Sequence, residues 1–147
     1  MVTGVQTCAL PILNILLFLT PKSKVEYVYD YFSIRQVLEK MSYHKYSAIP
    51  MLNKEGKYVG TITEGDLLWY IKDQSDYNIK KAELDPIKNV KRKMSIDPIK
   101  STENIEHVLK VAINQNFIPV EDDNGTFIGI IKRKDVIQYC SEQLFKK

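Results

Sequence analysis

The chain contains 147 residues, the length of one ordinary domain or of two small ones packed together. Its apolar share of 44% and charged share of 27% are typical of a globular protein and exclude a disordered or fibrous one. The net charge of +3 is too small to indicate nucleic acid binding by itself. Two cysteines, Cys8 and Cys140, exclude a disulfide framework and favour a reducing, cytoplasmic location.

The first segment, residues 1–13, differs from the rest of the chain. The apolar stretch Cys8–Thr20 is shorter than the roughly 20 residues of a membrane-spanning helix. Since no Lys or Arg precedes Lys22, the segment also lacks the basic region of a secretory signal. The string VTGVQTCALPI, residues 2–12, resembles a translated sequencing adapter. We therefore expect an artefactual tail and no membrane partner, and a genuine N-terminal tail is the alternative.

The remainder of the chain is an internal repeat, which indicates two copies of one unit. Matching residues stand 69 positions apart over the second half of each copy: Ile49 with Ile118, Pro50 with Pro119, Gly60 with Gly129, Ile62 with Ile131 and Asp66 with Asp135. Upstream the offset is 71, as for Ile34 with Ile105 and Val37 with Val108. Each copy is about 50 residues long, which is too short to bury a stable core alone.

Each copy predicts the element order β-α-β-β-α. The apolar spacing from Ile34 predicts a helix, with Ser33 as its N-cap and Thr102 in that position in the second copy. Hairpin turns at 53–56 and 122–125 separate the next two strands. The other elements are expected at 25–29, 47–52, 57–63 and 126–131 for strands, and 66–71 and 134–139 for helices.

These elements predict an α/β fold in which the two repeats pack sheet to sheet with pseudo-twofold symmetry. The expected boundaries are residues 14–72 for the first repeat and 94–142 for the second. Residues 73–93 are expected to form a linker with a short helix, because they are rich in charge and contain Pro86. Residues 143–147 are expected to be a C-terminal tail, with no effector domain after it.

Thr63 and Asp66 stand where the last strand of the first copy meets the following helix. An aspartate there can accept hydrogen bonds from both hydroxyls of a ribose. The spacing Thr-x-x-Asp is also that of a capping box, which satisfies the first amides of a helix. The two interpretations are compatible, and the residues alone leave both open.

The repeat, the strand SAIPMLN and the segment GTITEGD resemble a tandem CBS-domain pair, the Bateman module, over residues of roughly 20–142. The family pattern is Gly-hydrophobic-x-Thr/Ser-x-x-Asp/Asn. Residues 60–66 match its Gly, Thr and Asp. Residues 129–135 keep the Gly and the Asp but carry Lys132 in place of Thr or Ser.

The resemblance implies a regulatory module that binds an adenosine-containing nucleotide in two clefts between the repeats. The Thr and Asp of the motif hold the ribose, apolar strand residues enclose the base, and basic residues contact the phosphates. AMP, ADP, ATP and cyclic di-AMP are the ligands that the resemblance implies. It also implies a homodimer that modulates a protein partner.

Carried over by position, the motif assigns candidate ligand-binding residues to both clefts. The first cleft, suited to the ribose of AMP, ADP or ATP, comprises Thr63 and Asp66 with Ile96 and Ile118. The second cleft, richer in cations and suited to cyclic di-AMP, comprises Thr20, Lys22, Lys24, Val25, Ala48, Ile49, Lys132, Arg133, Lys134 and Asp135. A phosphate would offset the three cations at a helix start, although a solvated basic turn is the alternative.

Other conspicuous residues have ordinary interpretations. Tyr43, Tyr46 and Phe117 are expected in the core more often than against a base. Trp69 favours either a subunit interface or core packing. The histidines, His44 and His107, show no metal-ligand spacing, so we expect no metal and no cofactor.

No recognised catalytic motif occurs, so we expect no enzyme activity. The basic run 88–93 lacks interleaved aromatic residues, so we expect no nucleic acid partner. Two rival functions remain. Lys132 favours a dimerisation scaffold with vestigial clefts, and the unusual N-terminus leaves open a regulatory fragment of a larger enzyme.

Overall fold

The computed structural model describes residues 14–145, and of Ser75 only the backbone. The expected artefactual tail, residues 1–13, lies outside the described residues. The chain divides into two compact units, each with its own core. The first-repeat unit is Glu26–Ile96. Among the described residues, the second-repeat unit joins 14–25 with 97–145.

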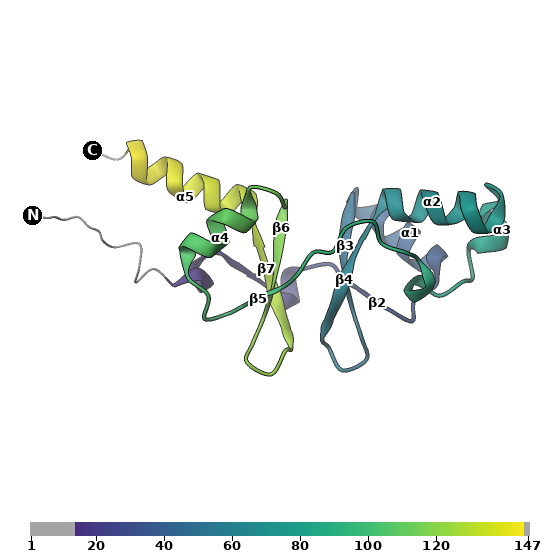
Figure 1. The fold of residues 1–147 in the computed structure, drawn as a ribbon, viewed down its shortest axis with the longest axis horizontal. Coiled ribbons are helices and arrows are strands. Elements are labelled where there is room, and N and C mark those ends of the chain that lie inside the picture. The colour runs from purple at the N-terminus through teal and green to yellow at the C-terminus, as the bar shows by residue number, and fades with distance from the viewer. Residues whose placement is uncertain (1–13, 146–147) are drawn as a thin grey trace, which may run out of the picture. The chain divides into compact units, whose positions relative to one another are not determined.

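The first-repeat unit is a three-stranded sheet with its helices on one side (Figure 1). The sheet order is β2-β3-β4, with β2 parallel and β4 antiparallel to β3. Its elements are β2 (Val28–Tyr29), α1 (Ile34–His44), β3 (Ala48–Leu52), β4 (Tyr58–Thr63), α2 (Glu64–Ser75), α3 (Ile79–Ala82) and the 3-10 turn η4 (Ile87–Asn89). The predicted strand 25–29 is thus confirmed only at its end.

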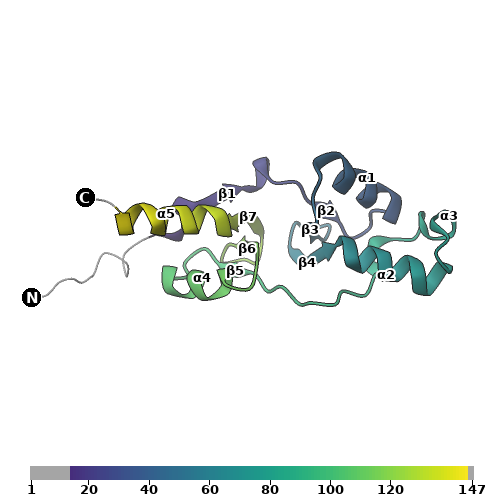
Figure 2. The same ribbon diagram turned by 90° about the horizontal axis from the view of Figure 1, so that it is seen from above.

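The second-repeat unit has a four-stranded sheet of order β1-β7-β6-β5. Strand β1 lies beside β7 and runs antiparallel to it (Figure 2). The elements are η2 (Ile15–Phe18), β1 (Leu19–Pro21), η3 (Lys22–Lys24), β5 (Ile99–Lys100), α4 (Ile105–Ala112), β6 (Phe117–Glu121), β7 (Phe127–Lys132) and α5 (Arg133–Phe145). Helix α5 therefore continues through residues 143–145, which the sequence assigns to a tail.

The α/β class and the β-α-β-β-α repeat are confirmed. The compact units nevertheless differ from the expected repeat boundary at residue 14. Residues 14–25 group with the second repeat because the backbone of β1 pairs with β7, from Leu19 opposite Ile131 to Pro21 opposite Gly129. The packing of the two sheets against each other stays a prediction.

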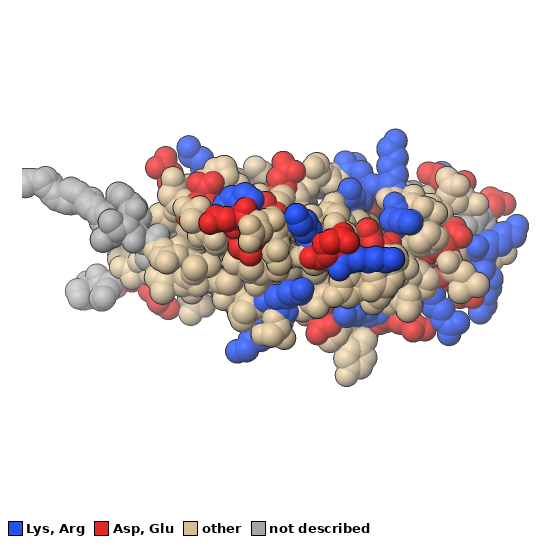
Figure 3. Space-filling view, turned by 90° about the horizontal axis from the view of Figure 1, so that it is seen from below, with Lys and Arg blue, Asp and Glu red and all other residues tan. Residues whose placement is uncertain are grey.

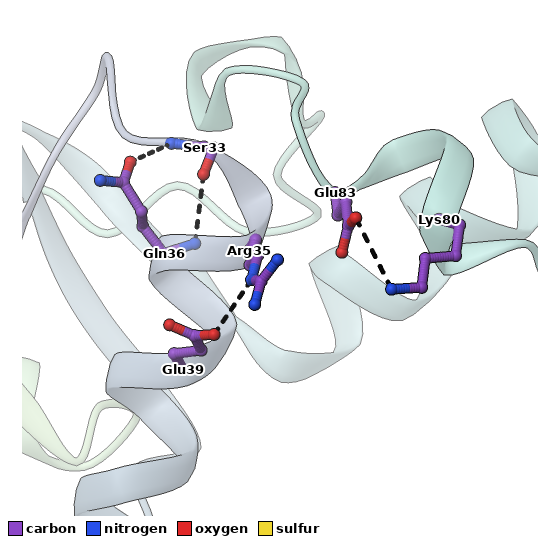
Figure 4. A network of polar contacts seen from close by, with 6 residues as sticks. All are labelled: Ser33, Arg35, Gln36, Glu39, Lys80 and Glu83. Carbon is purple, nitrogen blue, oxygen red and sulfur yellow. Dashed lines mark hydrogen bonds and ion pairs between the residues drawn. The ribbon is translucent and has the colours of Figure 1, made fainter.

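Local capping explains where α1 begins. The Ser33 hydroxyl accepts from the Gln36 amide at 3.2 Å, and the Gln36 side chain accepts from the Ser33 amide at 2.8 Å, as Figure 4 shows. This reciprocal capping box confirms Ser33 as the N-cap. An ion pair between Arg35 and Glu39, one helical turn apart, follows on the exposed face.

The start of α4 differs from the prediction. Asn104, not Thr102, is its N-cap, because the Asn104 side chain accepts from the His107 amide at 2.9 Å. Asn is as good an N-cap as Thr, and Asn104 directly precedes the first helical residue, Ile105. The sequence contains several cap-forming residues within three positions, so composition alone did not distinguish them.

The predicted linker is part of the first-repeat unit rather than a spacer. Its side chains Ala82, Ile87 and Val90 are buried in the same core as the helix and strand residues of the repeat. Its backbone also accepts the first amides of α1, from Ile34 to the Asp85 carbonyl and from Arg35 to the Glu83 carbonyl, both at 2.9 Å. The linker therefore completes both the core and the cap of α1.

The surface carries both signs of charge. On the face drawn in Figure 3, Lys and Arg side chains are interspersed with Asp and Glu. This mixture agrees with the small net charge of +3. Within residues 14–145, no helix is long and apolar enough to cross a membrane.

Candidate functional site

The first strand-to-helix junction is built by Thr63 and Asp66. The Thr63 hydroxyl accepts from the Asp66 amide, and Asp66 Oδ2 accepts from the Thr63 amide, each at 3.1 Å. This is a complete capping box at the start of α2, so the capping interpretation of this pair is confirmed. Asp66 is only 5% exposed, which is unusual for a carboxylate.

The end of the linker, at Arg92 and Lys93, closes over this junction. Asp66 Oδ1 accepts from the Lys93 backbone amide at 3.0 Å, and Arg92 Nη1 donates to the Val59 carbonyl at 2.7 Å. The Arg92 guanidinium lies so close to Gly60 that a Cβ at residue 60 would overlap it. Sequence reasoning missed Arg92 and Lys93 as neighbours of the motif, because their contact spans about 30 residues and has no local pattern.

Tyr58 connects the junction to Ile96, a predicted ligand contact. The Tyr58 hydroxyl donates to the Ile96 carbonyl at 2.8 Å and lies 2.7 Å from the Thr61 hydroxyl, which can donate to it. Since Tyr58 and Thr61 lie on β4, the segment that contains Ile96 is held against the strand that leads to Thr63. The sequence had assigned Tyr58 only to a strand.

A cavity of about 670 Å³ opens beside this junction. It is lined by Asp66, Trp69 and the three basic residues 91–93, among others. Trp69 is 53% exposed, so core packing is excluded for it. The cavity thus places an indole ring, a carboxylate and three cations together within one unit.

The second junction is built differently because Lys132 has no hydroxyl to cap the helix. Arg133 Nε instead donates to the carbonyls of Ala112 at 2.7 Å and Gln115 at 3.0 Å, where α4 ends. Arg133 is therefore already used within the fold. Lys132 and Lys134 are exposed and line a hollow of about 760 Å³.

Thr20 and Asp135, predicted to share a site, do lie together. Both line a cavity of about 300 Å³ with Phe18 and Tyr139. Thr20 is placed there by the pairing of β1 with β7. Asp135 is half-buried, and among the residues that the structure describes no donor makes a hydrogen bond to its carboxylate. Its oxygens therefore remain available for a ligand.

The other predicted residues are less well placed. Ile49 and Ile118 are fully buried in the two cores, and their contact with a base stays a prediction. Val25 is buried too, and Ala48 is half-buried at the start of β3. Lys22 and Lys24 lie in the turn η3 after β1, rather than in a strand. Their contact with phosphate stays a prediction.

The conspicuous aromatic and ionisable residues lie mostly outside the cores. Tyr43 is 83% exposed and Tyr46 is exposed, so the expected core positions for these two are wrong.

Burial, together with a hydrogen bond of 2.7 Å to Asp85, raises the pKa of Tyr70. In the described part of the chain, no three His, Cys, Asp or Glu side chains are grouped as metal ligands.

Comparisons with known proteins agree with this architecture. The family model named CBS domain matches residues 18–73 and 85–142. The crystal structure of CbpB in complex with c-di-AMP superposes with a TM-score of 0.81 at 25% identity, covering 91% of this chain and 88% of that one. CbpB from Streptococcus agalactiae superposes with a TM-score of 0.76 at 26% identity, covering 97% and 91%.

A curated relative is the A-adding tRNA nucleotidyltransferase of Aquifex aeolicus. It is 30% identical over 118 residues, which cover 80% of this chain but 13% of that protein. The chain spans about half or less of the length of the curated relatives that match first.

Proposed function

Because the chain belongs to the CBS-domain family, we propose that it is a non-catalytic regulatory module that binds an adenine nucleotide, either AMP, ADP or ATP or cyclic di-AMP. The observation that carries the proposal is the cavity with Thr20 and the available Asp135 carboxylate. A carboxylate without internal donors can accept both hydroxyls of a ribose. The similarity to CbpB, whose structure contains c-di-AMP, supports the same ligand class.

Calorimetric titration with AMP, ADP, ATP and cyclic di-AMP tests this function. We expect at least one to bind, and we expect Asp135→Asn to weaken binding about 10–100-fold, because it removes charge-assisted hydrogen bonds. Asp123→Asn, in the exposed turn between β6 and β7, is the matched control and should leave binding unchanged. Absence of binding by all four nucleotides at millimolar concentration would refute the proposal.

We further propose that the chain forms a homodimer through an apolar groove on the second-repeat unit. The groove has a volume of about 500 Å³ and lies along α4 and α5. Ile113 and Leu144 are 76% and 78% exposed there, and Ile137 adds to the same surface. Apolar side chains gathered in one exposed groove favour association with a second copy.

Sedimentation velocity tests the dimer. Ile137→Glu should dissociate it, since a charge would be buried in the interface. Leu84→Glu is the matched control, because Leu84 is equally apolar and 78% exposed but lies in the first-repeat unit outside the groove. A dimer that persists in the Ile137→Glu protein would exclude this surface.

In this function, nucleotide occupancy biases the dimer between two shapes, and the partner protein reads the shape. Two alternatives have specific support. The absent hydroxyl at Lys132 and the internally satisfied Asp66 favour a dimerisation scaffold whose sites no longer bind. The match to the nucleotidyltransferase covers 13% of the length of that protein, which favours a regulatory segment of a larger enzyme.

A further inference from the structure

We propose that Arg92 and Lys93 form a latch on the Asp66 site, so that nucleotide occupies the Asp135 site first and reaches Asp66 only after the latch opens. This inference rests on the proposed function and concerns the regulation of the same sites. The two motif aspartates occupy equivalent positions in the repeat, 69 residues apart, and yet they differ in their surroundings.

The Asp66 carboxylate is occupied by the chain itself. One oxygen accepts from the Thr63 amide and the other from the Lys93 amide, and the residue is 5% exposed. At 5% exposure the carboxylate is covered by the chain, so a ribose could reach it only after Lys93 moves away. The Lys93 amide and the ribose hydroxyls therefore compete for access to the same carboxylate, although its two oxygens have lone pairs for more than two hydrogen bonds.

Arg92 holds Lys93 in place. Its guanidinium donates to the Val59 carbonyl at 2.7 Å and lies against Gly60, the motif residue that has no side chain. Arg92 is itself exposed, so this charge-assisted bond competes with water and can open at modest cost. The latch is thus closed at rest and reversible.

The Asp135 site has no such latch. No hydrogen bond to its carboxylate is found among the described residues. Its cavity is lined by Thr20, Gln138 and Glu142 together with apolar and aromatic neighbours, and no basic residue is among them. The two junctions also differ three positions before the aspartate: Thr63 completes a capping box with Asp66, whereas Lys132 has no hydroxyl to do so. The repeat therefore contains one self-satisfied and one available carboxylate.

Trp69 is a natural reporter of the latched site. It is the chain's one tryptophan and lines the same cavity as Asp66, Arg92 and Lys93. With its indole 53% exposed, its fluorescence should change when the latch opens and a nucleotide enters. Calorimetry counts both binding events, whereas the Trp69 signal reports the Asp66 site.

The test is to titrate the nucleotide that binds the wild-type protein into the Arg92→Ala variant while recording Trp69 fluorescence. We expect the midpoint of the fluorescence change to fall about tenfold, since the loss of one charge-assisted bond favours the open latch. Lys91→Ala is the matched control: Lys91 lines the same cavity and carries the same charge, but no described residue bonds to it. It should leave the midpoint unchanged or raise it slightly.

A second variant separates the opening of the latch from the loss of the positive charge of Arg92. Gly60→Ala places a methyl group where the guanidinium lies, so it should displace Arg92 and lower the midpoint while keeping every charge. Weaker binding in the Arg92→Ala variant, beyond that of Lys91→Ala, would make Arg92 a ligand contact and overturn the latch. An unchanged midpoint would overturn it as well. Absence of calorimetric binding in the wild type would instead refute the proposed function.

Discussion

Gly60 and Gly129 occupy the same position of the repeat, and the structure predicts opposite outcomes for their replacement by alanine. At Gly129, φ is +153°, a region that side chains rarely adopt, and a Cβ would overlap the Thr20 carbonyl oxygen. Backbone strain of about 1–3 kcal/mol adds to an overpacking cost of about 1–3 kcal/mol. Gly129→Ala should therefore lower the free energy of unfolding by about 2–6 kcal/mol.

At Gly60 the overlapping atoms belong to the end of the flexible, exposed Arg92 side chain, and no positive φ is involved. Arg92 can move aside and lose a hydrogen bond of about 0.5–1.5 kcal/mol. Alanine also reduces the entropy of the unfolded chain, which stabilises by about 0.4–1 kcal/mol. The two effects nearly cancel, so Gly60→Ala should change the stability by less than about 1 kcal/mol.

Thermal unfolding followed by circular dichroism measures the contrast. At roughly 2–4 °C per kcal/mol for a chain of this size, Gly129→Ala should lower Tm by about 4–24 °C and Gly60→Ala by at most about 4 °C. The physical reason is that the Cβ at residue 129 overlaps a backbone oxygen of Thr20, which is held in β1, whereas the Cβ at residue 60 overlaps the end of the flexible Arg92 side chain. Equal loss of stability in the two variants would refute the reasoning and place β1 elsewhere than beside β7.

Two further predictions concern helix α4 and the linker. Asn104→Ala should lower the free energy of unfolding by about 1 kcal/mol because it removes the N-cap of α4, whereas Thr102→Ala should leave it unchanged. Urea unfolding measures both variants. A larger loss in Thr102→Ala than in Asn104→Ala would show that Thr102 is the N-cap. Tyr70→Phe should cost about 1 kcal/mol at pH 7 through loss of the bond to Asp85. Burial, then the hydrogen bond to Asp85, raises the pKa of Tyr70 above 10, so its stabilisation is complete below pH 10 and is lost as the pH rises further. The unfolding free energy of Tyr70→Phe should fall less steeply above pH 10, and parallel profiles would contradict this.

Much of the candidate site was predictable because it depends on short-range patterns. Thr63 and Asp66 stand three residues apart at a strand end, which is sufficient to predict their reciprocal bonds. The repeat offset then identified Asp135 as the equivalent of Asp66. The predicted pairing of Thr20 with Asp135 came from the family resemblance, and the structure places both residues in one cavity.

The positions that the sequence left open share a cause as well. The motif assigns Ile49 and Ile118 to base contact, and the structure buries both side chains on the core face of their strands, so their contact with a base stays a prediction. The sequence favours either a subunit interface or core packing for Trp69, and the structure leaves it 53% exposed beside the cavity along α2. The face that a side chain occupies and the residues that it contacts depend on tertiary packing. The apolar pattern of a single helix or strand does not specify that packing.

The sequence by itself determined the duplicated β-α-β-β-α unit, its hairpin turns and the capping pair at Thr63 and Asp66, because each depends on residues a few positions apart. Tertiary structure alone decided that β1 joins β7, that the linker enters a core, and that Arg92 and Lys93 close over Asp66. These contacts join residues about 30 to 110 positions apart. Such distant contacts depend on which apolar faces and which polar backbone and carboxylate groups remain uncovered once the local elements have formed.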